Sequence, residues 1–144
     1  MKFASVRVVT RNIDGMVAFY QRLSGLEALR PADGFAEMRF EGATLAMSSE
    51  QLIARFNAGA ATAAANQSAN QSANQSANQS ANQSANQSAI LEFEVEDVDA
   101  VFDRMNACGT QVVMPTTLMP WGNRSLLLRD PDGNLVNVFS RPRV

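Results

Sequence analysis

Residues 12–25 read NIDGMVAFYQRLSG and residues 97–109 read DVDAVFDRMNACG, and each stretch has the pattern of one amphipathic helix. Apolar residues recur at the same intervals in both stretches: Ile13, Met16, Val17, Tyr20 and Leu23 in the first, and Val98, Val101, Phe102, Met105 and Cys108 in the second. Each stretch begins with a residue that can cap a helix and ends with a glycine that can stop one. The same pattern occurring twice in the same order indicates an internal duplication.

Strand patterns around the two helices give both halves the order strand, helix, strand, strand, strand. In the first half we expect strands at 3–10, 26–29, 35–40 and 43–48, a helix at 13–23 and a short helix at 49–56. In the second half we expect strands at 90–95, 111–114, 123–128 and 134–139 and a helix at 98–108. The sequence therefore predicts an α+β fold of two tandem βαβββ modules, at 1–56 and 89–144, joined by a linker at 57–88.

The composition argues against several classes of protein. Of the 144 residues 46% are apolar, which suffices for one core or for two small fused modules. A formal net charge of −2 without a basic cluster argues against a nucleic-acid partner. No segment has the length of a membrane span and the first residues continue into a strand pattern, so we expect a cytoplasmic protein that does not bind membranes. Cys108 lies on a helical stripe and is expected to be a buried, inert thiol.

Between the halves, residues 65–88 are six copies of Ala-Asn-Gln-Ser. The copies have no charge and no apolar residue larger than alanine, so they cannot bury enough surface to offset the entropy lost on ordering. We expect a flexible tether in an inter-module loop, in which any helix is marginal. Its length permits the modules to pair within one chain or to be exchanged between chains.

Several short motifs lie in an order that resembles a known superfamily. They are NID at 12–14 followed by Phe19-Tyr20 and by LSGL at 23–26, VEDVDA at 95–100, PWGNRS at 120–125 and DPDGN at 130–134. With the doubled βαβββ order, they resemble the vicinal oxygen chelate superfamily, which includes glyoxalase I, extradiol dioxygenases and the fosfomycin- and bleomycin-resistance proteins. The resemblance covers the chain outside the repeat. It implies a curved mixed sheet around a cleft, with the helices on the outer face, and a homodimer.

Enzymes of that superfamily hold a divalent metal with His, Gln or Glu side chains on the inner strands, and this chain departs from the pattern. The resemblance aligns the ligand positions with Ser5, Ala46, Ile90 and Asn137. Alanine and isoleucine cannot bind a metal, and the chain contains no histidine. We therefore expect no metal at that site and no cofactor, while a different site made only of carboxylates stays open.

Strand alternation predicts which residues line the cleft, because the side chains of one strand point alternately to opposite faces. If the apolar members pack under the helices, the polar members remain for the concave face, with Phe35 and Trp121 at its rim. The candidate ligand-binding residues are Arg7, Phe35, Glu37, Arg39, Glu92, Glu94, Trp121 and Asn137. The alternative is that the arginines and glutamates only pair with one another on a solvated sheet face.

Two functions fit this pattern. The first is a metal-free protein that sequesters a small amphipathic or cationic molecule, as in the bleomycin-resistance branch of antibiotic resistance. The second is a metal-independent enzyme in which Glu37, Glu92 or Glu94 acts as general base and Arg7 or Arg39 stabilises the developing anion. A third possibility is a vestigial cleft in a domain that only dimerises. We expect the binding protein, with no catalytic residue.

Overall fold

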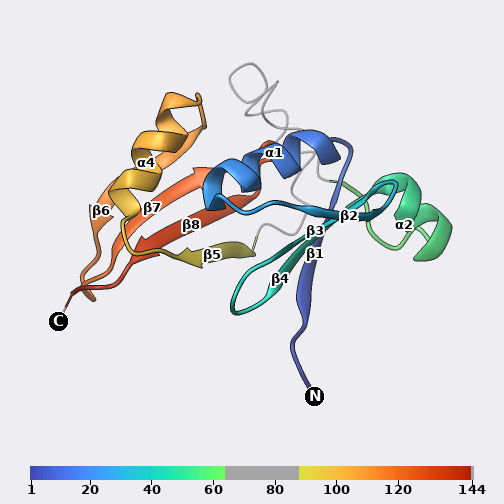
Figure 1. Cartoon of the computed structure of the whole chain (residues 1–144), viewed down its shortest axis with the longest axis horizontal. Helices are drawn as coiled ribbons and strands as arrows, with labels where there is room; N and C mark the ends of the chain where they lie inside the picture. The colour runs from blue at the N-terminus through green and yellow to red at the C-terminus, as the bar shows by residue number, and fades with distance from the viewer. Residues whose placement is uncertain (64–87, 144) are drawn as a thin grey trace. The chain divides into compact units, whose positions relative to one another are not determined.

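The structure, a computed structural model, describes residues 1–63 and 88–143, whose helices and strands are shown in Figure 1. The chain divides into two compact units, Met1–Asn66 (unit 1) and Gln67–Val144 (unit 2). The predicted tether lies outside the described residues except for Ser88. Both units have the predicted order strand, helix, strand, strand, strand, which confirms an α+β fold of two similar βαβββ modules.

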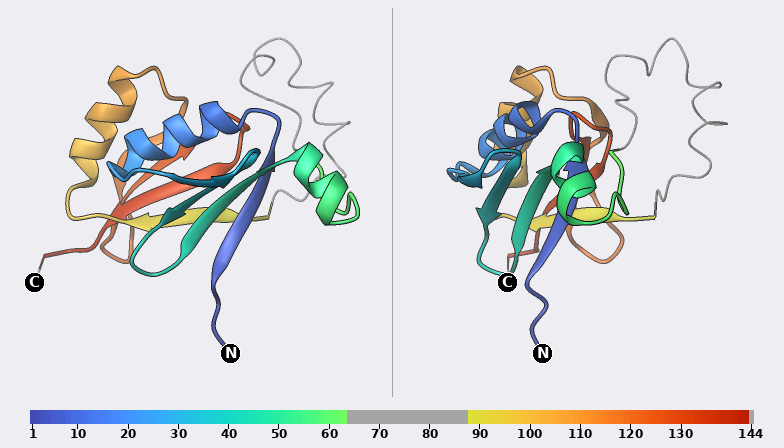
Figure 2. Two further views of the ribbon diagram at one scale, coloured as in Figure 1. Left: turned by 45° about the vertical axis from the view of Figure 1, so that its right-hand side comes forward. Right: turned by 90° about the vertical axis from the view of Figure 1, so that its right-hand side faces the viewer.

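Unit 1 contains a four-stranded mixed sheet in the order β1-β4-β3-β2. Its elements are β1 (Ser5–Thr10), α1 (Ile13–Ser24), β2 (Leu29–Ala32), β3 (Phe35–Arg39), β4 (Thr44–Ser49) and α2 (Glu50–Phe56). β1 pairs with β4 in parallel, and the other neighbouring strands are antiparallel. Figure 2 shows α1 lying along one face of this sheet, with α2 following the end of β4.

Unit 2 repeats this topology in a second four-stranded mixed sheet, in the order β5-β8-β7-β6. Its elements are β5 (Ile90–Glu94), α4 (Val98–Ala107), β6 (Val112–Leu118), β7 (Arg124–Arg129) and β8 (Leu135–Ser140). β5 pairs with β8 in parallel, as β1 does with β4. Each module thus forms its own four-stranded mixed sheet with the same strand order.

Side-chain caps begin both long helices as predicted. The Oδ1 atom of Asn12 accepts a hydrogen bond from the Gly15 amide at 3.1 Å, and Oδ1 of Asp97 accepts one from the Ala100 amide at 3.1 Å. α1 ends at Gly25, whose φ of 74° is the left-handed conformation that glycine adopts without strain. No helix among the described residues is long and apolar enough to cross a membrane.

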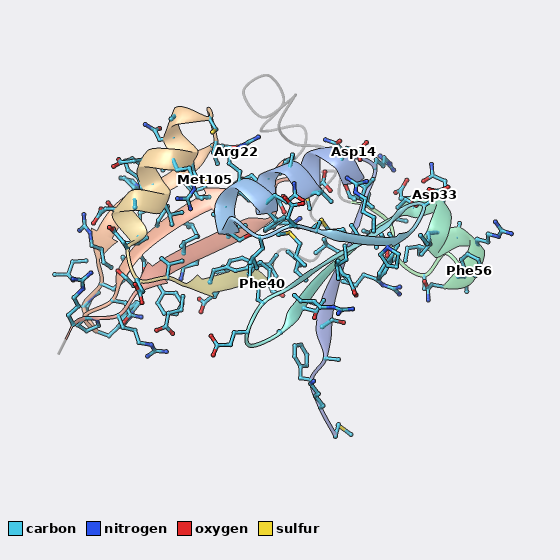
Figure 3. All side chains as sticks on the ribbon, in the orientation of Figure 1. Asp14, Arg22, Asp33, Phe40, Phe56 and Met105 are labelled. Carbon is cyan, nitrogen blue, oxygen red and sulfur yellow. The ribbon has the colours of Figure 1, made fainter. Side chains whose placement is uncertain are left out.

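In each unit the main core lies between the long helix and one face of its own sheet, and in unit 1 Ile53 of α2 is buried as well. In unit 1, buried apolar residues of α1 pack above β3 and β4: Met16, Val17, Phe19, Tyr20 and Leu23 from the helix, and Ala36, Met38, Leu45 and Met47 from the strands. In unit 2, the core consists of Val98, Val101 and Met105 from α4 and of Leu126, Leu128, Val136 and Val138 from β7 and β8. Met105, which is labelled in Figure 3, is fully buried.

Two edge strands differ from the prediction. β2 begins at Leu29, where the sequence analysis expects it to end, because the Ser24 hydroxyl and the Gln21 amide oxygen bind the backbone amides of Leu26 and Ala28. β6 continues to Leu118, past the predicted end at 114. Both strands contain a proline, Pro31 or Pro115, which an edge strand tolerates because one side of its backbone needs no ladder partner.

Strand alternation also predicts that the apolar residues Val6 and Val8 pack under the helix, and this is wrong for Val6, which is 38% exposed, while Val8 is only half-buried. Both lie on β1 at the edge of the sheet, whereas α1 contacts the inner strands β3 and β4. The buried thiol expected at Cys108 is also wrong. Cys108 follows the last turn of α4 as its C-cap residue and is exposed.

Candidate functional site

The register of sheet 1 places the predicted polar residues of unit 1 on the face opposite α1. Arg7 lies beside Ala46, which in turn lies beside Glu37, and Ser5, Thr44 and Arg39 form the next row. The alternate positions Leu45 and Met47 of β4 are buried in the core under α1, so these rows belong to the other face. We call this surface the polar face of unit 1, made of Ser5, Arg7, Phe35, Glu37, Arg39, Thr44 and Ala46.

The charges on the polar face of unit 1 are engaged within the unit. Arg39 donates hydrogen bonds from Nε and Nη2 to Oε1 of Glu37 at 3.2 and 2.7 Å. Nη2 of Arg7 donates to the side-chain oxygen of Asn57, the C-cap residue of α2, at 3.2 Å. Phe35 is the first residue of β3, at the opposite end of the strand from Arg39, and is half-buried. The pairing of Arg39 with Glu37 agrees with the alternative in which charges satisfy one another on a sheet face.

The polar face of unit 2 consists of Glu92, Glu94, Ser125, Leu127, Asn137 and Phe139, again opposite the helix. Glu92 is the parallel-sheet partner of Asn137, and the amide nitrogen of Asn137 donates to Oε1 of Glu92 at 3.4 Å. Glu94 is the partner of Phe139 in the next row. Glu92 and Glu94 are both exposed, because β5 lies at the edge of the sheet. This face therefore presents two carboxylates beside an amide and an aromatic ring.

Arg141 is a functional candidate that the sequence analysis does not identify. Its Nε lies 3.0 Å from Oε1 of Glu94, and its guanidinium carbon lies 5.8 Å from the centre of the Phe139 ring. The signal for it is strand alternation, because residue 141 follows Phe139 by two positions and so continues the same face past the end of β8. Phe139 and Glu94 together hold a cation in this structure.

Trp121 lies in the turn between β6 and β7 and is 70% exposed. The turn is closed by backbone hydrogen bonds from Met119 to Asn123 and from Gly122 to Met119. A side chain added at Gly122 would lie 3.2 Å from the ring of Pro142, so this turn packs against the residue after Arg141. That Trp121 and Phe35 form the rim of an inter-module cleft stays a prediction.

The four residues that the sequence analysis aligns with metal-ligand positions do not fit a metal. Ser5 and Ala46 share the polar face of unit 1, and Ile90 and Asn137 share one face in unit 2, but in each pair the two residues lie in adjacent rows. Ala46 is buried and offers only a methyl group, and Ile90 offers only hydrocarbon. Within residues 1–63 and 88–143, no three His, Cys, Asp or Glu residues cluster in a way that could hold a metal ion.

The groups with displaced pKa values lie away from the polar faces. The pKa of the Asp99 carboxyl lies below its ordinary value, chiefly because of a hydrogen bond from Arg124 and secondly because of one with Thr116. The hydrogen bond with Asp99 in turn raises the pKa of Arg124. Arg11 and the Ala63 amide likewise lower the pKa of Glu50. Asp99 and Glu50 lie in the first turns of α4 and α2, so these interactions hold the helices in place.

Similar proteins share this fold. The family model for the Glyoxalase/Bleomycin resistance protein/Dioxygenase superfamily matches residues 2–138. A glyoxalase/bleomycin resistance protein/dioxygenase from Nocardioides is 19% identical with a TM-score of 0.70, covering 99% of this chain and 85% of that one. An enzyme of the same description from Burkholderia phytofirmans PsJN is 16% identical with a TM-score of 0.71, covering 97% and 98%. TioX from Micromonospora sp. ML1 is 20% identical with a TM-score of 0.65, covering 98% and 99%. None of the curated proteins compared with the chain matches it.

Proposed function

Because the chain belongs to the glyoxalase/bleomycin resistance protein/dioxygenase superfamily, we propose that it is a metal-free protein that binds and sequesters a small amphipathic, cationic molecule. The observation that supports this most directly is the polar face of unit 2. There Glu92 and Glu94 project from alternate positions of one edge strand, beside Asn137 and Phe139. Two exposed carboxylates next to an aromatic ring form a surface that favours an organic cation.

The chemistry of the face suits binding without a reaction. A cation can approach the carboxylates through solvent, and the half-buried Phe139 ring offers an apolar and quadrupolar surface for its aromatic part. The Asn137 amide, which donates to Glu92, adds a polar group that orients a ligand. Sequestration needs only affinity. Binding a toxic compound would lower its free concentration, which is the resistance-type role that we propose here.

The family's metal chemistry is not part of this proposal, because Ala46 and Ile90 stand where donors are required. The general-base alternative would place the proton transfer on one of the three polar-face glutamates. Glu37 and Glu94 already form ion pairs with Arg39 and Arg141 inside their own units. These pairs support the use of the carboxylates as cation-binding groups.

Binding can be measured through Trp121, the only tryptophan in the chain. Its turn packs against Pro142, next to Arg141 and the polar face of unit 2. We expect the cationic aromatics proflavine, berberine and ethidium to change Trp121 emission saturably, with affinities checked by equilibrium dialysis. The neutral aromatic coumarin should bind less tightly, because it gains nothing from the carboxylates.

The double variant Glu92→Gln with Glu94→Gln should weaken cation binding about tenfold or more if the two contacts are desolvated on binding. The matched control is Glu27→Gln with Glu41→Gln, which removes the same charge at exposed positions of unit 1 that lie off the polar faces. Equal affinities for the two double variants would contradict the proposal, as would a panel that does not bind at all. Turnover of a substrate that Glu92→Gln abolishes would instead favour the enzyme.

A further inference from the structure

We propose that Arg141 occupies the cation position of the unit 2 polar face, and that a ligand's amidinium or guanidinium group binds by displacing it. This inference rests on the function proposed above and specifies its ligand class. It starts from the contacts of the Arg141 side chain, which pairs with Glu94 at 3.0 Å and lies 5.8 Å from the Phe139 ring centre. A planar cation held between a carboxylate and an aromatic face is the arrangement that such a ligand would reproduce.

The backbone brings the three residues together. Glu94 and Phe139 are register partners in the parallel pair β5 and β8, so their side chains leave the same face in the same row. Arg141 follows Phe139 by two residues, just past Ser140 at the end of β8. The guanidinium therefore comes from a residue just past the last strand, whereas Glu94 and Phe139 lie within the sheet.

The exposure of the pair makes it exchangeable. The Arg141 and Glu94 side chains are 65% and 51% exposed, and an ion pair in contact with water is held weakly. The ion pair between Arg124 and Asp99 differs, because Arg124 donates from two nitrogens to both Asp99 oxygens and also binds Thr116. Arg124 is thus fastened to its site at several points, and Arg141 is joined to Glu94 through a single 3.0 Å ion contact.

The geometry also favours one ligand class. A guanidinium or amidinium group is planar and can lie over an aromatic ring while it donates in-plane hydrogen bonds to a carboxylate. An ammonium group is compact and more strongly hydrated, and it cannot match both contacts in the same way. An aromatic amidine should therefore compete with Arg141 directly, whereas the neutral amide of the same shape should not.

Benzamidine and benzamide are the probes for this test, titrated into the full chain and followed by calorimetry and by Trp121 emission. The test variant is Arg141→Gln, and the control is Arg143→Gln, which removes the same charge two residues further on. Arg143 suits the control because it forms no ion pair among the described residues. We expect Arg141→Gln to bind benzamidine about two- to fivefold more tightly than the wild type. The gain corresponds to the free energy of an exposed ion pair, which the ligand no longer has to break. Arg143→Gln should bind benzamidine as the wild type does, and benzamide affinity should stay unchanged. Adding Glu94→Gln to Arg141→Gln should abolish the gain.

The outcomes separate the two proposals. If benzamidine binds the wild type and Arg141→Gln with equal affinity, displacement is overturned and the binding function stands. An equal gain in Arg143→Gln also overturns displacement, because the effect would then come from net charge and not from the contact. If neither benzamidine nor the cationic panel binds the wild type or any variant, the proposed function fails and this inference fails with it.

Discussion

The guanidinium of Arg124 donates two hydrogen bonds to the carboxylate of Asp99, at 2.7 and 2.8 Å, and thereby joins the first residue of β7 to the first turn of α4. Arg124 also donates to Thr116 on β6 at 3.1 Å. One side chain thus connects two strands and the helix that covers them. It lies on the helix side of the sheet, since Leu126 and Leu128 on the same face of β7 are buried under α4.

This ion pair should make the stability of unit 2 depend on pH. Arg124 and Thr116 lower the pKa of Asp99 in the folded state below the value of about 3.9 found in unfolded chains. The stabilisation is therefore fully present above that value and is lost as pH falls through the folded pKa. We expect Asp99→Asn to lower the urea midpoint at pH 7 and to change it much less at acid pH. The measurement is urea unfolding followed by Trp121 emission.

A matched control for that experiment is Asp103→Asn, which removes a carboxylate from an exposed position of the same helix. It should not reproduce the pH-dependent difference, because the effect requires the contact with Arg124. An Asp99→Asn variant whose midpoint stays below the wild-type midpoint by the same amount at both pH values would contradict the prediction.

Gly25 and Gly109 offer a test of the duplication at one position of each copy. Both have a φ of 74° and open space around the position of an added Cβ, so a substitution there meets backbone strain and no clash. Gly25→Ala and Gly109→Ala should each destabilise the fold by about 1–2 kcal/mol, the cost of left-handed backbone for a residue with a Cβ. Chemical denaturation measures this. Gly42→Ala is the control, because Gly42 also has open space but no positive φ, and an equal loss there would refute the strain argument.

The helices and the duplication could be predicted from sequence because both depend on local features. The apolar stripes and the caps Asn12 and Asp97 act within a few residues of each other, and the structure has them as expected. β2 could not be placed, since its start depends on two side chains of α1 that bind residues 26 and 28. The apolar residues Leu26, Ala28 and Leu29 alone do not reveal that side chains compete with a strand partner for these backbone amides.

For the candidate site, alternation along the strands correctly grouped the polar residues on one face in each unit, because period two is a backbone property. It could not predict the partners of Arg7 and Arg141. Asn57 follows α2 and Arg141 follows β8, so both contacts depend on where the end of a helix or strand lies in space. Long side chains with several rotatable bonds choose partners from that surrounding structure.

The residues at the ligand positions also predict the metal content of the purified protein. With Ala46 and Ile90 in place of donors, we expect less than about 0.1 equivalent of Zn, Mn, Ni or Fe per chain after purification without chelators. Elemental analysis measures this, alongside a known zinc protein prepared in the same way. About one equivalent that survives dialysis would show that the chain holds a metal with other residues, and the binding proposal would then need revision.

The last prediction concerns the Ala-Asn-Gln-Ser repeat. Deleting residues 69–88 removes five copies and joins Ala65–Ser68 to Ala89. Since the repeat has no large apolar side chain and loop-closure entropy changes slowly with length, the thermal midpoint should change by about 3 °C or less. A second variant keeps the length but shuffles the order of the 24 residues from 65 to 88, and it should match the wild type. Loss of stability in both variants would show that the repeat packs on the fold through its specific order. Light scattering on the same samples measures the oligomeric mass, and a mass that differs between the wild type and the shortened chain would show that the length of the connection affects the exchange of modules between chains.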